Sequence, residues 1–134
     1  MSREKILLVD DEADILEVVG VRIKSWGYEL LKAKNGKEAI GIVKAKKTDL
    51  VVLDYMLPDM DGIAVLKEIR KINKKIPVIM FTSYPNPTAM YAAENLGISA
   101  YVAKLSIPSD DRQALLKTAV DMAIKKISED NKKA

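Results

Sequence analysis

The sequence contains neither cysteine nor histidine among its 134 residues. The absence of cysteine excludes disulfides, thiolate nucleophiles and metal centres built on sulfur. The absence of histidine excludes Ser–His–Asp triads, metal centres with imidazole ligands and a phosphohistidine formed on this chain. Chemistry is therefore left to carboxylates, hydroxyls, lysine and the backbone.

Long apolar runs are also missing. The run nearest the N-terminus, Ile6–Val9, has four residues and ends at two aspartates, which is too short for the core of a signal peptide. No uninterrupted run approaches the ~20 apolar residues that span a bilayer. We therefore predict a cytoplasmic protein without a membrane partner.

The excess of positive charge is small and lies near the C-terminus. Four of the 22 basic residues and two of the 19 acidic residues fall within 125–134, which leaves a net charge of only +1 for the first 124 residues. A nucleic-acid-binding domain normally carries a concentrated basic face. The charge balance therefore predicts no direct binding to nucleic acid.

Short apolar segments alternate with segments of helical period along the whole chain. Strands are expected at 5–9, 28–33, 50–53, 78–81 and 100–103, and helices at 12–26, from 36 onward, at 61–73, at 88–96 and over 116–127. Five strand–helix units predict a parallel sheet, because a helix supplies each crossover between parallel strands. The expected architecture is one doubly wound α/β domain over residues 1–128, followed by a polar, frayed tail at 129–134.

Polar side chains follow four of the five expected strands. These residues are Asp10, Asp11, Glu12, Asp54, Thr82, Ser83 and Lys104. The carboxyl ends of parallel strands share one edge of the sheet, so we expect the residues to meet there. Clustered carboxylates repel one another and favour a cation, and an all-oxygen set of ligands suits Mg²⁺.

Several of these residues also have an ordinary structural explanation: Thr82 alone fits the end of a strand, and Lys104 alone fits a solvated surface lysine. Asp10 or Asp11 alone fits the N-cap of the following helix, and Asp54 alone fits the start of a turn. A nucleotide-binding loop is excluded, because the residues after the first strand, Val9 to Glu12, match neither G-x-G-x-x-G nor G-x-x-x-x-G-K-[ST].

Four ordered motifs resemble the receiver domain of two-component response regulators. They are ILLVDDE at 6–12, LDYMLPDMDG at 53–62, MFTS at 80–83 and YVAK at 101–104. The resemblance covers residues 6 to about 127 and implies a flavodoxin-like (βα)₅ fold with strand order 2-1-3-4-5.

The resemblance also implies a reaction. Asp54 would be the phosphoacceptor, which receives a phosphoryl group from the phosphohistidine of a histidine kinase or a histidine phosphotransfer protein. Asp10, Asp11, Asp54 and the backbone carbonyl of Met56 would hold Mg²⁺, or another divalent cation such as Mn²⁺. Such a protein is a phosphoacceptor that assists its own phosphorylation and slow dephosphorylation, not an enzyme that turns over a separate substrate.

The remaining implied roles concern the response to phosphorylation. Lys104 and Thr82 would contact the phosphoryl oxygens. Thr82 and Tyr101 would then form a switch that changes the surface of the fourth helix, fifth strand and fifth helix, where Tyr91 is a candidate contact for an unknown downstream partner or output domain. Three departures from the family pattern are present, namely Leu105 where the family usually has proline, a segment at 106–111 that is longer than usual, and Pro85 in the loop after Thr82.

Two other functions remain open from the sequence. The first is a Mg²⁺-dependent phosphohydrolase with an aspartyl-phosphate intermediate, which usually needs a second carboxylate two residues after the nucleophile, where this chain has Met56. The second is a degenerate receiver that acts as a constitutive interaction module. The sequence fits a stand-alone switch and an excised domain equally well.

Overall fold

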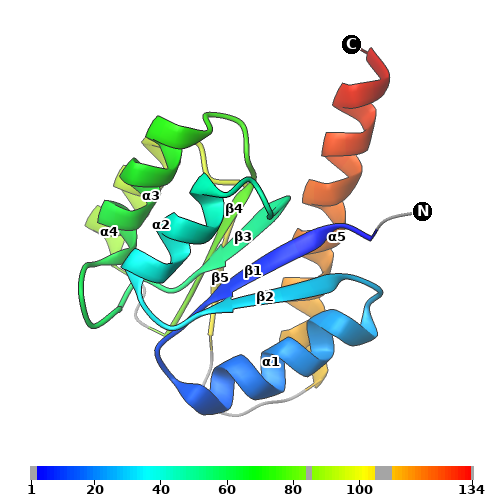
Figure 1. Cartoon of the computed structure of the whole chain (residues 1–134). Helices are drawn as coiled ribbons and strands as arrows, with labels where there is room; N and C mark the ends of the chain where they lie inside the picture. The colour runs from blue at the N-terminus through cyan, green and yellow to red at the C-terminus, as the bar shows by residue number, and fades with distance from the viewer. Residues whose placement is uncertain (1–2, 84–85, 105–109, 134) are drawn as a thin grey trace.

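The structure is a computed structural model that describes residues 3–83, 86–104 and 110–133. Strands and helices alternate along the chain, as predicted from the apolar segments (Figure 1). The elements are β1 (Lys5–Val9), α1 (Ala13–Ser25), β2 (Glu29–Ala33), α2 (Gly36–Lys44), β3 (Leu50–Leu53), α3 (Gly62–Ile72), β4 (Val78–Thr82), α4 (Pro87–Asn95), β5 (Ala100–Ala103) and α5 (Asp110–Lys133).

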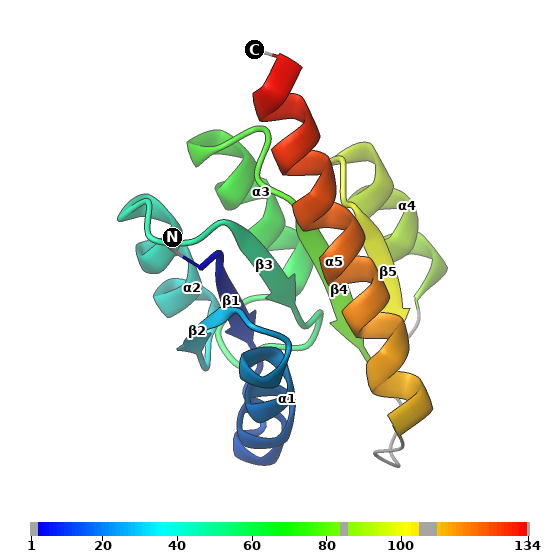
Figure 2. The same cartoon turned by 90° about the vertical axis from the view of Figure 1, so that its right-hand side faces the viewer.

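The five strands form one parallel sheet in the order β2-β1-β3-β4-β5. This confirms the predicted doubly wound α/β architecture and the strand order that the resemblance implies. Helices α1 and α5 cover one face of the sheet, and α2, α3 and α4 cover the other (Figures 1 and 2). The sheet is therefore the middle of three layers.

Strand residues alternate between two separate cores. In β1, Leu7 and Val9 pack toward α2, α3 and α4, whereas Ile6 and Leu8 pack toward α1 and α5. Successive side chains of a strand point to opposite faces, so a sheet covered on both faces needs apolar residues at every position. This explains why the central strands are uninterrupted apolar segments in the sequence.

Three helices end on a residue in the left-handed region of backbone conformation. After α1 and α4 that residue is glycine, at Gly27 (φ +97°) and Gly97 (φ +74°). After α2 it is Lys46, with φ +58°, and it is the single non-glycine residue of positive φ among those the structure describes. A side chain makes this conformation costly, so glycine is the usual residue at such a helix end.

Several boundaries differ from the predicted ones by one residue, and α5 begins at Asp110, ahead of its expected start at 116. Strand β4 includes Thr82, one residue beyond the expected end. Helix α5 continues through Lys133, so residues 129–133 are helical where a frayed tail is expected (Figure 1). The division of the chain at residue 128 stays a prediction. Among the described residues, no helix combines the length and the apolar character needed to cross a bilayer.

Candidate functional site

The register of the sheet brings Asp10 and Asp54 side by side. Val9 of β1 pairs with Leu53 of β3, so the next residues leave the sheet together. The backbone N–H of Asp54 donates to the Val9 carbonyl at 3.1 Å, and that of Asp10 donates to the Ala33 carbonyl on β2 at 3.0 Å. Both carboxylates thus start from fixed backbone at the edge where ligands collect in this type of sheet.

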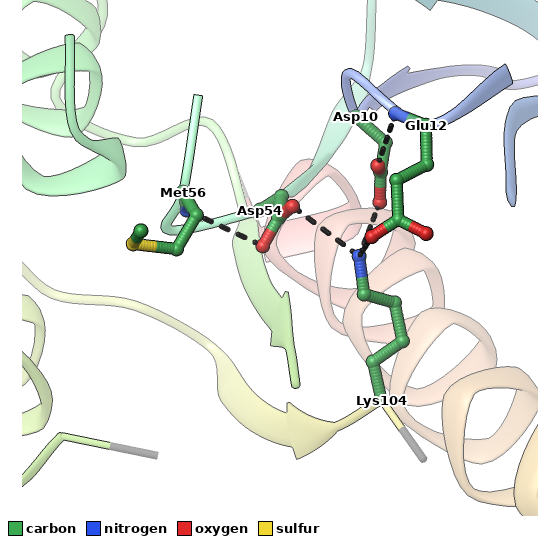
Figure 3. Close-up of polar contacts among 5 residues, drawn as sticks. All are labelled: Asp10, Glu12, Asp54, Met56 and Lys104. Carbon is green, nitrogen blue, oxygen red and sulfur yellow. Dashed lines mark hydrogen bonds and ion pairs between the residues drawn. The ribbon is translucent and has the colours of Figure 1, made fainter. Parts of the chain in front are cut away.

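Lys104 reaches the same place from the other half of the sheet. Its backbone N–H donates to the Thr82 carbonyl at 2.7 Å, which anchors the residue just after β5. Its Nζ donates to Asp10 Oδ2 at 2.6 Å and to Asp54 Oδ2 at 3.2 Å, and lies 3.8 Å from Glu12 Oε1. Figure 3 shows the ammonium group pointing between these carboxylates. Residues 94 and 50 positions apart in sequence therefore form one charged cluster.

Burial controls the electrostatics of this cluster. Asp10, Asp54 and Lys104 are 1%, 4% and 5% exposed. Burial raises the pKa of Asp10, although Lys104 and the backbone N–H of Glu12, which donates to Asp10 Oδ1 at 2.9 Å, oppose the rise. Burial alone would lower the pKa of Lys104, but the two neighbouring carboxylates outweigh it and raise that pKa. The lysine therefore stays charged between the two acids.

An exposed acidic group lies next to the buried cluster. The carboxylate oxygens of Asp10, Asp11 and Glu12 lie within 4.8 Å of one another. A cavity of about 180 Å³ is lined by Asp11, Glu12, Asp54, Met56, Ser83 and Lys104. Asp11 and Glu12 are exposed to solvent, and the side chains of Asp10, Asp11 and Glu12 offer a metal ion only oxygen atoms as ligands. These residues fit a hard divalent cation such as Mg²⁺ beside Asp54.

The backbone after Asp54 is tightly packed. Asp54 Oδ1 accepts a hydrogen bond from the Met56 N–H at 3.4 Å, and the Gly62 N–H donates to the Tyr55 carbonyl at 2.7 Å. A Cβ on Gly62 would lie 2.6 Å from the carbonyl oxygen of Asp54 and 2.8 Å from the Cα of Tyr55. Only glycine lets α3 begin this close to the loop, so Gly62 positions the backbone of Asp54.

Glu12 and Ser83 line the cavity, at the sheet edge where the sequence placed them, although neither residue had been assigned a role. Gly62, which supports the wall of the cavity, was not among the predicted site residues. Gly62 follows Asp61, whose side chain caps α3, but a close backbone approach across a loop leaves no local pattern.

The predicted switch residues lie near the site rather than in its cavity. Thr82 is fully buried at the end of β4, and Ser83, not Thr82, lines the cavity. Tyr101 is half-buried with an enclosed hydroxyl. Burial raises its pKa, and the nearby backbone of Asn86 opposes the rise without reaching hydrogen-bond geometry. Tyr91 on α4 is 70% exposed. The roles of these residues stay predictions.

Some of the features predicted from the sequence involve residues that the structure does not describe. Pro85, Leu105 and the segment 106–109 lie outside the described residues. The predicted carbonyl ligand at Met56 belongs to a residue that lines the cavity, and its role as a ligand stays a prediction.

Comparison with known proteins bears on this site directly. The family described as the response regulator receiver domain matches residues 6–119 of the chain. The chain belongs to this family. The receiver domain is therefore a component of two-component signal transduction, as the four sequence motifs predicted.

Relatives of this receiver domain include both longer and similar-sized proteins. It is 37% identical over 110 residues to a protein named "Probable transcriptional regulator ycf27" from Porphyridium aerugineum, a match that covers 82% of this chain and 45% of the relative. It is 38% identical over 104 residues to "Sporulation initiation phosphotransferase F" from Bacillus subtilis, covering 78% of this chain and 84% of that one. The chain thus spans less than half the length of the ycf27 relative.

Solved receiver domains share the fold. A receiver domain protein described as CheY-like, from Methanospirillum hungatei, matches with a TM-score of 0.84 at 26% identity, and the match covers 96% of this chain and 99% of that one. The receiver domain of an HD domain-containing protein from Pseudomonas fluorescens matches with a TM-score of 0.80 at 31% identity, covering 92% and 95%.

Proposed function

We propose that Asp54 accepts a phosphoryl group from the phosphohistidine of a histidine kinase or a histidine phosphotransfer protein. The observation that carries this proposal is a buried carboxylate held by Lys104 on one oxygen and by the Met56 N–H on the other, at the wall of a cavity. A carboxylate oxygen attacks phosphorus, the P–N bond breaks, and the imidazole nitrogen keeps the electron pair and takes up a proton. The product is an aspartyl phosphate.

The residues of the chain supply position and charge. Transfer turns the Asp54 carboxylate into a mixed anhydride, so the Lys104 ammonium loses one anionic partner and gains a phosphoryl oxygen, which lies two bonds beyond the former carboxylate oxygen. The Thr82 hydroxyl donates to a second phosphoryl oxygen. Asp10, Asp11 and the Met56 carbonyl would hold Mg²⁺ together with Asp54, and a bound Mg²⁺ supplies positive charge that neutralises the phosphoryl oxygens. No step needs histidine on this chain.

Phosphoacceptance is favoured over hydrolysis of a separate substrate. The residue two positions after Asp54 is Met56, whose side chain has no proton to give to a leaving group and is 52% exposed. The neighbouring buried acid, Asp10, is engaged by Lys104 at 2.6 Å. Without a proton donor beside the nucleophile, repeated turnover of phosphate esters is not expected.

We propose that phosphorylation changes the surface formed by α4, β5 and α5, and that a downstream protein binds there. Tyr91 on α4, with Leu115 and Met122 on α5, are each more than 60% exposed. Leu115 and Met122 are two helical turns apart and so lie on one side of α5. This surface fits a downstream protein with an apolar contact. Similarity to "Sporulation initiation phosphotransferase F" supports a role in a phosphorelay. The cytoplasmic location of the chain stays a prediction.

The test is incubation with Mg²⁺ and a small acyl phosphate, followed by intact mass measurement. The wild-type chain is expected to gain one phosphoryl group, and Asp54→Asn is expected to gain none. Asp14→Asn, which removes an exposed carboxylate in the first turn of α1, is the matched control and should label like wild type. EDTA should abolish the gain.

Three outcomes would contradict the proposal in different ways. Equal labelling of Asp54→Asn would show that the acceptor is elsewhere. Release of many equivalents of phosphate from added phosphate esters would favour the phosphohydrolase. No labelling of wild type by any phosphodonor would favour the constitutive interaction module.

A further inference from the structure

Six lysines gather at the end of the sheet opposite Asp54. Residues 44–48 (KAKKT) begin at the last residue of α2, and residues 71–75 (KINKK) span the end of α3 and the turn after it. Neither segment contains an acidic residue. Between the two segments lies a cavity of about 570 Å³. We call it the lysine groove and define it by its apolar residues Val43, Ile72 and Ile76 and its basic residues Lys46, Lys74 and Lys75.

The lysine groove is remote from the phosphorylation site. Its segments immediately precede β3 and β4, whereas Asp54 and Thr82 stand at the other ends of those strands. Figure 2 shows the strand arrows pointing toward the lower end of the view, with the turns after α2 and α3 at the upper end. A partner in the groove would therefore leave Asp54 uncovered.

The described part of the domain offers no counter-charge to the lysines of the groove. Of the nearest acids in sequence, Glu68 Oε1 pairs with Lys71 Nζ at 3.0 Å, and Asp49 Oδ2 accepts from the Lys5 N–H at 2.8 Å. Lys46, Lys74 and Lys75 are exposed. Across the described ranges, no carboxylate lies within ion-pair distance of any of these three lysines.

Helix-end electrostatics account for only part of this cluster. Lysine in the last turn of a helix is stabilised by the helix dipole, which explains Lys44 in α2 and Lys71 in α3. Lys46, Lys74 and Lys75 lie beyond the caps of those helices, at Ala45 and Asn73. Their number and placement need another explanation.

Lys46 occupies a position where glycine would fit better. The equivalent residues after α1 and α4 are Gly27 and Gly97, whereas Lys46 adopts φ +58° with a full side chain. Such strain in a non-glycine residue persists where something else is gained from the side chain. Here the side chain adds a positive charge to the rim of the groove.

The apolar residues of the groove narrow the choice of ligand. Val43 and Ile76 are buried and Ile72 is half-buried beneath the lysines. We propose that the lysine groove binds an acidic segment of a partner protein, with an apolar side chain on Val43, Ile72 and Ile76 and carboxylates beside Lys46, Lys74 and Lys75. A single nucleic-acid strand is normally held by stacking on aromatic residues, and no aromatic residue lines this groove. A flat lipid surface does not fit a concave site.

The test is fluorescence anisotropy with a labelled glutamate-rich peptide that carries two leucines. We expect saturable binding at low salt that weakens as salt rises. The variant Lys74→Gln/Lys75→Gln should bind roughly five- to tenfold more weakly, because each exposed ion pair contributes modestly. The matched control, Lys125→Gln/Lys126→Gln, removes the same charge from exposed positions on α5 and should bind within about twofold of wild type.

A second variant separates charge from folding. Lys46→Gly should weaken peptide binding while raising the midpoint of thermal unfolding, because it removes the charge and relieves the positive φ together. A groove lysine that served folding alone would not weaken binding when replaced.

Each remaining outcome overturns the proposal. Equal weakening by the two double variants would mean unspecific attraction to net charge. Equal affinity for a peptide with serine in place of leucine would exclude the apolar contact. Tighter binding of a single-stranded oligonucleotide of equal charge, with the same dependence on Lys74 and Lys75, would assign the groove to nucleic acid, and no peptide binding at low salt would leave it without this ligand.

Discussion

Charged side chains are buried and paired at one end of the central sheet, and exposed and without an acidic partner among the described residues at the other. At the carboxyl ends of the strands, Asp10 and Asp54 are buried and share the ammonium group of Lys104. At the other end, Lys46 and its neighbours in the lysine groove are exposed and have no acidic partner in the described part of the chain. The buried charges are held in one geometry by one another, whereas the exposed charges are free to pair with another molecule.

This difference shows that the distance between two charged atoms does not by itself determine how much an ion pair contributes to stability. Lys104 Nζ lies 2.6 Å from Asp10 Oδ2, and Lys117 Nζ lies 2.6 Å from Asp121 Oδ2 on α5. The first pair is at most 5% exposed, whereas the side chains of the second are 47% and 40% exposed. Removing one member of a buried pair leaves the other charge desolvated and unpaired, whereas the remaining member of a surface pair is still solvated by water.

The largest predicted effect is therefore that of Lys104→Met. In EDTA at neutral pH it should lower the free energy of unfolding by about 3 kcal/mol, because two buried carboxylates lose their counter-charge. Lys117→Met should lower it by about 0.5 kcal/mol or less, since that pair is solvated. Urea unfolding of both variants provides the measurement. Equal losses would remove the contrast between the two kinds of pair.

The next effect concerns the backbone that carries Asp54. Gly62→Ala should cost about 2 kcal/mol of stability, because the new Cβ meets backbone atoms that cannot turn aside. It should also slow labelling by acyl phosphate, as the loop bearing Asp54 shifts. The control is Gly41→Ala in α2, where a new Cβ would meet nothing within 4 Å. This substitution should stabilise the helix by about 0.5–1 kcal/mol. A stable Gly62→Ala variant with normal labelling would show that the close approach is unimportant.

A smaller effect of the opposite sign is expected at the lysine end. Lys46→Gly should raise the free energy of unfolding by about 0.5–1 kcal/mol, because glycine adopts positive φ without strain. The reverse change after α4, Gly97→Ala, should lower it by about 1 kcal/mol, although the new Cβ would meet nothing within 4 Å. Thermal or urea unfolding of the pair would test whether backbone conformation accounts for both. A loss of stability in Lys46→Gly would contradict this explanation.

The smallest predicted effect is a dependence on pH. Burial raises the pKa of Asp10 above its ordinary value of 3.8, so the native state binds this proton more tightly than the unfolded chain does. Stability from Asp10 should therefore rise as the pH falls from the raised value toward 3.8. Asp10→Asn should lack this contribution, so its unfolding free energy, measured in EDTA, should differ from wild type by an amount that changes with pH. Parallel curves would refute the assignment.

The fold could be predicted from the sequence because its signals are local. Apolar strand segments such as Leu50–Leu53 and the helix stops at Gly27 and Gly97 are visible in any short window of sequence. A polar segment is harder to assign. Residues 129–133 carry no apolar residue to mark a helix, yet they continue α5 because the preceding turns are already packed on the sheet.

The positions of Asp10, Asp54, Thr82 and Lys104 at strand ends were equally visible, because parallel strands place their carboxyl ends together. The sequence by itself thus determined the alternating elements, the family and the candidate acceptor.

Only the tertiary structure decided which of these charges pair and which stay free. Contacts between Lys104 and residues 94 and 50 positions away depend on the strand register, and the clash that requires glycine at position 62 depends on a loop folding back. The summed charge of +3 likewise hid an acid-rich end and a lysine-rich end. Composition adds charges without regard to position, whereas burial and distance fix the energy of each one.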